Sequence, residues 1–264
     1  MQALGLQYAT AWDLYQGLLQ RAGGGTQLSW SDMPDWTGLW TWKPGRGFAF
    51  DPDMPEGVST TATLTPEFQR RFDESLALLA KGLEYDPISS CAPPGFPRWL
   101  AIPFLREHIV TPSQTWLTSE TVNNVRRVYT DGRGHMAPED RYALYYGDSI
   151  GFWNDQKALT IHTNQLRAGI YQRGNPEYSD QVETVEIWQK VDDSTIEVDV
   201  WVYDPPVLVE PWYVRQRYTK VPNDDTRLRI HYWDCGENQN NAVYQTPEGG
   251  TQFRDFTFTD TDNR

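Results

Sequence analysis

The sequence has few positive charges, few cysteines and no long apolar run. Its 264 residues carry 23 Lys and Arg against 36 Asp and Glu, a formal net charge of −13 at pH 7. Nucleic acids and anionic membranes attract positive surfaces, so this balance argues against both as partners. No apolar run reaches the length of a membrane span, and the N-terminus lacks the basic and apolar stretches of a secretory signal. We therefore expect a cytoplasmic protein, or a periplasmic one if an export signal has been removed.

Motifs that identify common cofactor and metal sites are also missing. Cys91 and Cys235 permit one disulfide, but their spacing does not show whether it forms. The sequence has no C-x-x-C pair, P-loop, G-x-G-x-x-G, G-x-S-x-G or H-E-x-x-H. Its four histidines are scattered without metal-ligand spacing. The sequence therefore predicts neither a nucleotide cofactor nor a bound metal.

Aromatic residues are what the chain has in excess, with 12 Trp and 14 Tyr. Large aromatic side chains in such number indicate either a densely packed core or a cavity lined for an aromatic ligand, and composition leaves both open.

The pattern along the chain predicts one mainly β domain of the α+β class. An amphipathic helix at Leu4–Arg21 lies in an N-terminal extension, residues 1–25, and a second helix near 66–81 begins at Thr65-Pro66. The body, residues 30–240, reads as a single antiparallel β-barrel of the lipocalin type, and residues 241–264 as a tail. The first helix packs its apolar stripe on its own chain or, alternatively, on a second copy in a homo-oligomer. The expected strands are Trp36–Trp42, His108–Thr111, Gln114–Thr118, Val125–Thr130, Ile150–Trp153, Ala158–Thr163, Thr184–Val191, Thr195–Tyr203, Tyr213–Lys220 and Arg227–Trp233.

Alternation along these strands predicts two different faces. In Thr195–Tyr203, every second residue from Ile196 to Val202 is aliphatic, and the other face carries Trp201, Tyr203 and two acids. If the aliphatic faces pack under the helices, the mixed faces line a cavity. If the aliphatic faces fill the barrel, the mixed faces point outward.

Two histidines are the candidates for proton transfer, because imidazole titrates near neutral pH. His135 follows a Gly-rich turn, and His162 shares a strand face with Thr160. Arg127 and Tyr129 would hold a developing anion. Each histidine has a purely structural role as its alternative, and each arginine a salt bridge. The candidates for substrate binding are Arg98, Arg133, Trp153, Trp188, Trp201 and Tyr203, and one of Glu183 and Glu186 is expected to face inward.

Three motifs resemble those of a large group of uncharacterised bacterial proteins, over roughly residues 30–240. They are Cys91-x-Pro93-Pro94-Gly95-x-Pro97-Arg98, Arg126-Arg127-x-Tyr129-Thr130-Asp131-Gly132-Arg133-x-His135 and Gly147-Asp148-Ser149-Ile150-Gly151-x-Trp153. The chain departs from the group at Asp148, where the group usually has His, and after Trp153, where Asn154-Asp155-Gln156 replaces Glu-Gly-Asp. The resemblance implies a calycin-like barrel around a small apolar ligand.

Two functions follow from these patterns. The first is a cofactor-independent lyase or isomerase that acts by acid–base chemistry on an aromatic or otherwise apolar small molecule, for which a lignin-derived phenolic is a fitting context. The second is a lipocalin-like carrier that binds the same kind of aromatic ligand without turnover.

Overall fold

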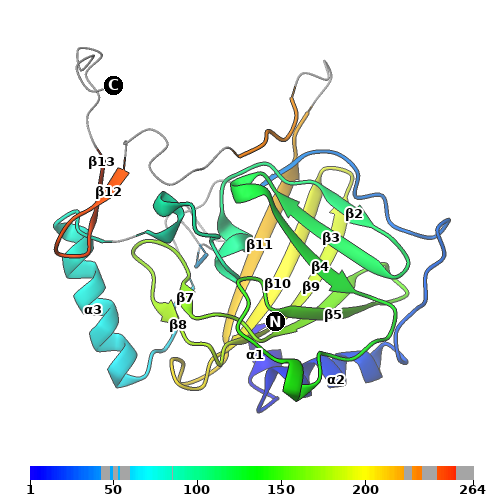
Figure 1. The fold of residues 1–264 in the computed structure, drawn as a ribbon. Helices are drawn as coiled ribbons and strands as arrows, with labels where there is room; N and C mark the ends of the chain where they lie inside the picture. Colours follow the sequence, from blue (N-terminus) through cyan, green and yellow to red (C-terminus); the bar gives the residue numbers. More distant parts are fainter. Residues whose placement is uncertain are drawn as a thin grey trace.

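The computed structural model describes residues 1–42, 48–49, 53, 60–84, 86–222, 228–233 and 243–253, with the backbone alone at 243–245 and 251–253. Figure 1 shows a curled β-sheet with two N-terminal helices along one side and a third helix apart from it. Within these ranges, no helix combines the length and the apolar character that crossing a membrane requires. The helices are α1 (Gln2–Gly5), α2 (Ala11–Arg21) and α3 (Pro66–Ala80), with short 3-10 turns at Pro87–Ser90, Arg98–Ala101, Thr121–Asn123 and Pro138–Asp140.

The N-terminal segment forms two helices, so the predicted single helix Leu4–Arg21 is wrong. Thr10 is the reason: its backbone is extended, and its hydroxyl accepts a hydrogen bond from the Asp13 amide, which starts α2 afresh. The second predicted helix is confirmed as α3, which begins at Pro66. It ends ahead of Gly82, whose φ of +71° is a left-handed conformation that glycine adopts without strain.

Nine strands form one sheet in the order β1-β11-β10-β9-β6-β5-β4-β3-β2. This confirms a mainly β, barrel-like fold, but the sheet curls into a half-barrel and stays open. Among the described residues, a single bridge, between Trp40 and Arg106, joins its two ends. The strands are β1 (Trp40–Trp42), β2 (His108–Val110), β3 (Gln114–Ser119), β4 (Asn124–Tyr129), β5 (Asp148–Trp153), β6 (Leu159–Asn164), β9 (Glu183–Asp192), β10 (Thr195–Tyr203) and β11 (Trp212–Lys220). Two small hairpins pair β7 (Gly169–Ile170) with β8 (Glu177–Tyr178), and β12 (Val243–Gln245) with β13 (Thr251–Phe253).

One strand pair departs from the predicted antiparallel arrangement. β4 and β5 run parallel and pair only at Val128 with Ser149 and at Tyr129 with Ile150. A parallel pair requires a long crossover, and the connection over residues 130–147 supplies it. The pairing joins the end of β4 to the first residues of β5, so β4 from Asn124 to Arg127 has no ladder partner on this side.

Two of the predicted strands are shorter or absent. Trp36 lies outside β1 because its carbonyl accepts a hydrogen bond from the indole N–H of Trp40, which turns the chain. Residues 228–233 form no strand, and Arg227 lies outside the described residues. In that segment the backbone N–H groups of His231 and Trp233 donate to the side chains of Glu120 and Asn123 instead of to a sheet ladder.

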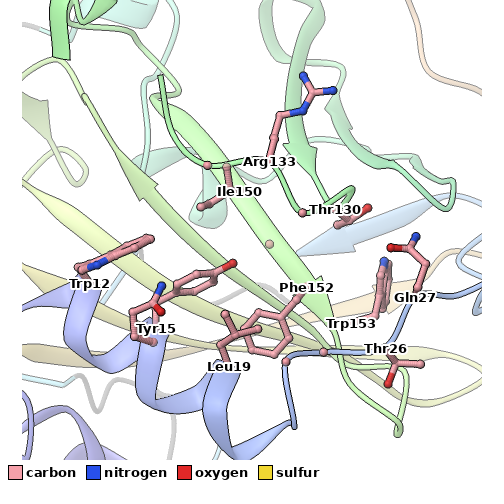
Figure 2. Close-up of a pocket in the computed structure, with 16 residues that line it drawn as sticks. Trp12, Tyr15, Leu19, Thr26, Gln27, Thr130, Arg133, Ile150, Phe152 and Trp153 are labelled. Carbon is pink, nitrogen blue, oxygen red and sulfur yellow. The ribbon is translucent and has the colours of Figure 1, made fainter. Parts of the chain in front are cut away.

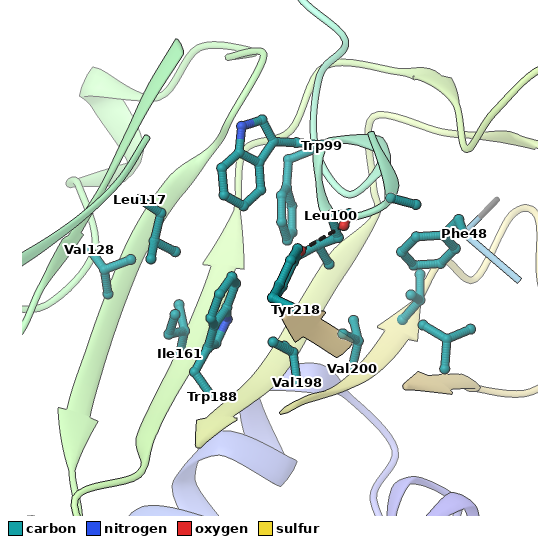
Figure 3. Close-up of a cluster of buried hydrophobic side chains, with 14 of the residues drawn as sticks. Phe48, Trp99, Leu100, Leu117, Val128, Ile161, Trp188, Val198, Val200 and Tyr218 are labelled. Atoms are coloured by element: carbon teal, nitrogen blue, oxygen red, sulfur yellow. Dashed lines mark hydrogen bonds between the residues drawn. The ribbon is translucent and has the colours of Figure 1, made fainter. Parts of the chain in front are cut away.

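Aliphatic and aromatic side chains fill the concave side of the sheet. The even-numbered residues of β10 from Ile196 to Val202 point inward, as the alternation predicts, together with Leu159 and Ile161 of β6. Figure 3 shows Ile161, Val198 and Val200 around Trp188, which stacks on Tyr218. The second of the two arrangements considered above is therefore correct: the aliphatic faces fill the half-barrel, and the mixed faces point outward.

The convex side is partly covered by the first two helices. Ala11, Leu14 and Tyr15 of α2 pack on Ile150 and Phe152 of β5 and on neighbouring strands. The apolar stripe of the N-terminal helix thus packs on its own chain, while its role in a homo-oligomer stays a prediction. Cys91 is disulfide-bonded, and Cys235, the only other cysteine of the chain, lies outside the described residues.

Candidate functional site

His162 reaches the convex side because β6 alternates strictly. Leu159 and Ile161 point into the core, so His162 lies on the opposite face, between Ile150 of β5 and Val185 of β9. The crossover between β4 and β5 then brings His135 back over the same face. Two histidines from a strand and a loop thus meet under α2.

The two imidazole rings form the centre of a hydrogen-bonded chain of four side chains. Nε2 of His135 lies 2.7 Å from Nδ1 of His162. Nδ1 of His135 lies 2.7 Å from a carboxylate oxygen of Asp148, and Nε2 of His162 lies 3.2 Å from one of Glu183. The order Asp148–His135–His162–Glu183 uses all four ring nitrogens. We call these four residues the relay chain.

Counting protons defines the charge of the relay chain. A nitrogen–nitrogen contact of 2.7 Å needs one proton between the rings, since two lone pairs would repel each other. If both carboxylates are ionised, each also accepts one imidazole N–H. Three ring protons are then shared by four nitrogens, so one of the two rings is an imidazolium.

The surroundings favour His135 as the charged ring. Burial lowers the pKa of His162, and Glu183 and Glu186 offset this only in part. His135 instead touches Asp148, whose pKa burial would raise, but hydrogen bonds from the His135 ring and the Met136 amide lower it below its ordinary value. With both carboxylates ionised, we therefore infer that His162 is the neutral ring and donates from Nε2 to Glu183, and that His135 holds the extra proton and donates to both of its neighbours.

Aromatic rings of α2 cover the relay chain. The Trp12 ring lies 5.2 Å from that of His162 and 5.9 Å from that of His135, measured between centroids, and Tyr15 lies 5.6 Å from His162. Beside this cover is a cavity of about 370 Å³. Figure 2 shows Trp12, Tyr15 and Leu19 on α2, with Phe152 of β5 close to Leu19 and Ile150 of β5 farther from the helix.

A second cavity, of about 470 Å³, lies between β4 and the end of the crossover that leads into β5. We call it the β4–β5 cavity. It combines one end of the relay chain with the side chains predicted to hold an anion: its lining includes His135, Asp148, Arg127, Tyr129 and Arg133. The structure thus brings His135, Arg127 and Tyr129 together, and it places His162 immediately behind them.

The three predicted arginines have different partners. Arg98 is buried and makes two hydrogen bonds to Asp86, of 2.9 and 2.7 Å, so it has the salt-bridge role considered as its alternative. Arg133 pairs with Asp131 and stacks on Tyr129. Arg127 stacks on the Trp116 ring, and no carboxylate in the described part of the chain forms a salt bridge with it.

The predicted aromatic residues fall in three places. Trp188 packs in the core, where its indole N–H donates to Glu186. Trp153 is also buried in that core, and an edge of it lines the cavity beside α2. Trp201 and Tyr203 lie under the N-terminal segment, with the Tyr203 hydroxyl donating to the Gly5 carbonyl.

Sequence reasoning missed the buried ion pair on the concave side. Arg126, next to the predicted Arg127, donates to both carboxylate oxygens of Glu186 at 2.8 and 2.7 Å, and both residues are buried. Arg126 also donates to Ser149 and Thr163. Strand alternation alone signals that neighbouring arginines have opposite environments. It also confirms that Glu186, not Glu183, faces inward.

The described residues contain no group of three or more His, Cys, Asp or Glu side chains that could hold a metal ion. A scan of protein-family models finds no match to this chain, and a search of curated proteins finds no similar sequence.

Proposed function

We propose that the protein is a cofactor-independent lyase or isomerase, with His135 as the acid–base group and the β4–β5 cavity as the substrate site. The observation that carries the proposal is the hydrogen-bonded relay chain, whose Asp148–His135 end lines a cavity together with Arg127 and Tyr129. A histidine held between a carboxylate and a second ring has a defined tautomer and orientation, which proton transfer requires.

The charges of the β4–β5 cavity suit an anion that develops on an aromatic substrate. Arg127 brings a guanidinium without a carboxylate partner in the described residues, and the phenol ring of Tyr129 lies beside it. Both ring nitrogens of His135 have partners, so the substrate takes the place of Asp148 at Nδ1, and in the charged state His135 gives it the Nδ1 proton. In the neutral state, it accepts one from the substrate, and Arg127 stabilises the negative charge that remains. Phenolic compounds of the kind that lignin releases have groups that can carry such a negative charge.

The experiment is incubation with a panel of phenolic dimers, followed by chromatography for products. We expect turnover by the unmodified protein, and loss of turnover with retained binding in His135→Ala and His162→Ala. Arg70→Ala is a control for binding, since Arg70 forms an exposed pair with Glu74 on α3, outside this cavity. Binding without product, with unchanged affinity in both histidine variants, would contradict the enzyme and favour a lipocalin-like carrier.

A further inference from the structure

We propose that Glu183 is the outer end of a proton relay that joins the substrate site to a separate cavity open to solvent. The inference rests on the proposed acid–base function of His135 and deepens it: the site would exchange protons through Glu183 while a substrate occupies the β4–β5 cavity.

Glu183 lines a cavity of about 460 Å³ at the start of α2, which we call the α2 cavity. Its other lining residues include Trp12, Gln181 and Tyr203, and none of its lining residues also lines the β4–β5 cavity. The relay chain has one carboxylate in each cavity, Asp148 in the first and Glu183 in the second.

Exposure differs sharply along the relay chain. The side chain of His162 is 1% exposed, whereas that of Glu183 is 37% exposed. Trp12 covers His162 edge-on from α2. The middle of the relay chain is therefore shielded from water, and Glu183 is the part from which a proton can leave directly to solvent.

A proton can pass from His135 to Glu183 without any hydrogen bond of the relay chain being broken. Charged His135 transfers its Nε2 proton to Nδ1 of His162, and His162 transfers its Nε2 proton to the Glu183 carboxylate. His135 ends neutral, His162 remains neutral as the other tautomer, and Glu183 becomes the uncharged acid. Each of the three hydrogen bonds keeps one proton during these two transfers. Loss of the Glu183 proton to water then leaves a carboxylate opposite the unprotonated Nε2 of His162, so this one hydrogen bond opens. Uptake of a proton by Glu183 restores it, and the reverse sequence recharges His135.

The charged and titratable groups around the two rings come from four elements. Asp148 belongs to β5, Glu183 and Glu186 to β9, and Tyr15 to α2. Arg141, from the crossover, acts on the Asp148 end. Glu186 is neutralised by Arg126 on the concave side, so Glu183 is the acid that faces His162 directly.

The test uses Glu183→Gln, which keeps the side-chain size but cannot exchange a proton. Glu120→Gln is the matched control, because Glu120 contacts exposed His231 at 3.2 Å, outside the relay chain. In an NMR titration of the imidazole rings, we expect Glu183→Gln to lower the pKa of His162, which the Glu183 carboxylate raises, and Glu120→Gln to leave the pKa of His162 unchanged. An unchanged pKa of His162 in Glu183→Gln would overturn the relay, whether or not the protein turns over a substrate.

Turnover gives a second measurement, which would not change in this way if Glu183 had a merely structural role. With a substrate found as above, we expect Glu183→Gln to lower kcat by about tenfold or more with little change in KM, and added imidazole buffer to restore it. An unchanged kcat, or a loss that no buffer restores, would overturn the relay and leave the acid–base role of His135 intact. Absence of turnover in the unmodified protein would contradict the proposed function, and the NMR titration would still decide the relay.

Discussion

Nε2 of His135 and Nδ1 of His162 lie 2.7 Å apart, although the two residues are 27 positions apart in the chain. One belongs to the crossover between two parallel strands and the other to the middle of the sheet. Their contact ties the crossover to the convex face, and it places a shared proton between a cavity and a shielded interior.

Asp148 stabilises this contact, and its removal has a defined pH dependence. Because its pKa is lowered in the folded state, its contribution to stability is present above the ordinary value near 3.8 and is lost as the pH falls through the folded pKa. We expect Asp148→Asn to reduce the free energy of unfolding at pH 7 by about 2 kcal/mol. In urea denaturation, the difference should shrink towards zero in strong acid, and exposed Asp155→Asn should have little effect at either pH.

Trp12 contributes to the burial of the His162 ring. Burial is the main cause of the lowered pKa of His162, and the Trp12 ring supplies part of that burial from α2. We therefore expect Trp12→Ala to raise the pKa of His162 in an imidazole NMR titration. Trp30→Ala removes an indole that is 73% exposed and should leave that pKa unchanged. An unchanged or lower pKa of His162 in Trp12→Ala would show that Trp12 does not shield His162 from solvent.

The Arg126–Glu186 pair on the concave side gives a separate prediction about stability. Removal of one partner leaves a buried charge uncompensated, so Arg126→Met should cost about 3–5 kcal/mol of unfolding free energy. The double variant Arg126→Met with Glu186→Met should cost clearly less. The exposed pair Arg70–Glu74 is the control, and Arg70→Met should change stability by about 0.5 kcal/mol or less. Equal costs for the single and double variants would contradict this.

His108 should make the free energy of unfolding depend on pH in the acid range. Burial, with the Arg106 cation as a smaller cause, lowers its pKa to about 3 from the ordinary 6.5. Between these values the unfolded chain binds a proton that the folded chain excludes, so stability falls as the pH drops from 6.5 to 3, by up to about 1.4 kcal/mol per pH unit. We expect His108→Leu to reduce this fall in stability, measured by urea denaturation at several pH values. Substitution of exposed His231 by Leu should leave the fall unchanged.

The sequence predicts most strands because alternation is strict where one face is buried. Val198 and Val200 point inward and Trp201 outward, as their spacing implies. The parallel β4–β5 pair could not be predicted, since a crossover with no regular structure gives no signal of its direction. The sequence also gives no sign that the sheet stays open, because β1 and β2 have the composition of ordinary paired strands.

The site was predictable residue by residue but not as an arrangement. His135, His162, Arg127 and Tyr129 stand out by chemistry, whereas their partners do not. Asp148 follows a glycine and resembles an ordinary turn cap, a role it also performs for the Met136 amide. Glu183 is one of 36 acids, and only the sheet register brings it to His162. The partner of a side chain depends on tertiary contacts, which local patterns do not encode.

The most direct test of this account is the protonation of the two histidine rings near neutral pH, read from nitrogen-15 shifts in an imidazole NMR spectrum. The account predicts His135 protonated on both nitrogens, His162 protonated on Nε2 alone, and a strongly deshielded proton between the rings that disappears in His162→Ala. Two histidines that titrate independently, each as an ordinary neutral ring with no shared proton, would contradict it.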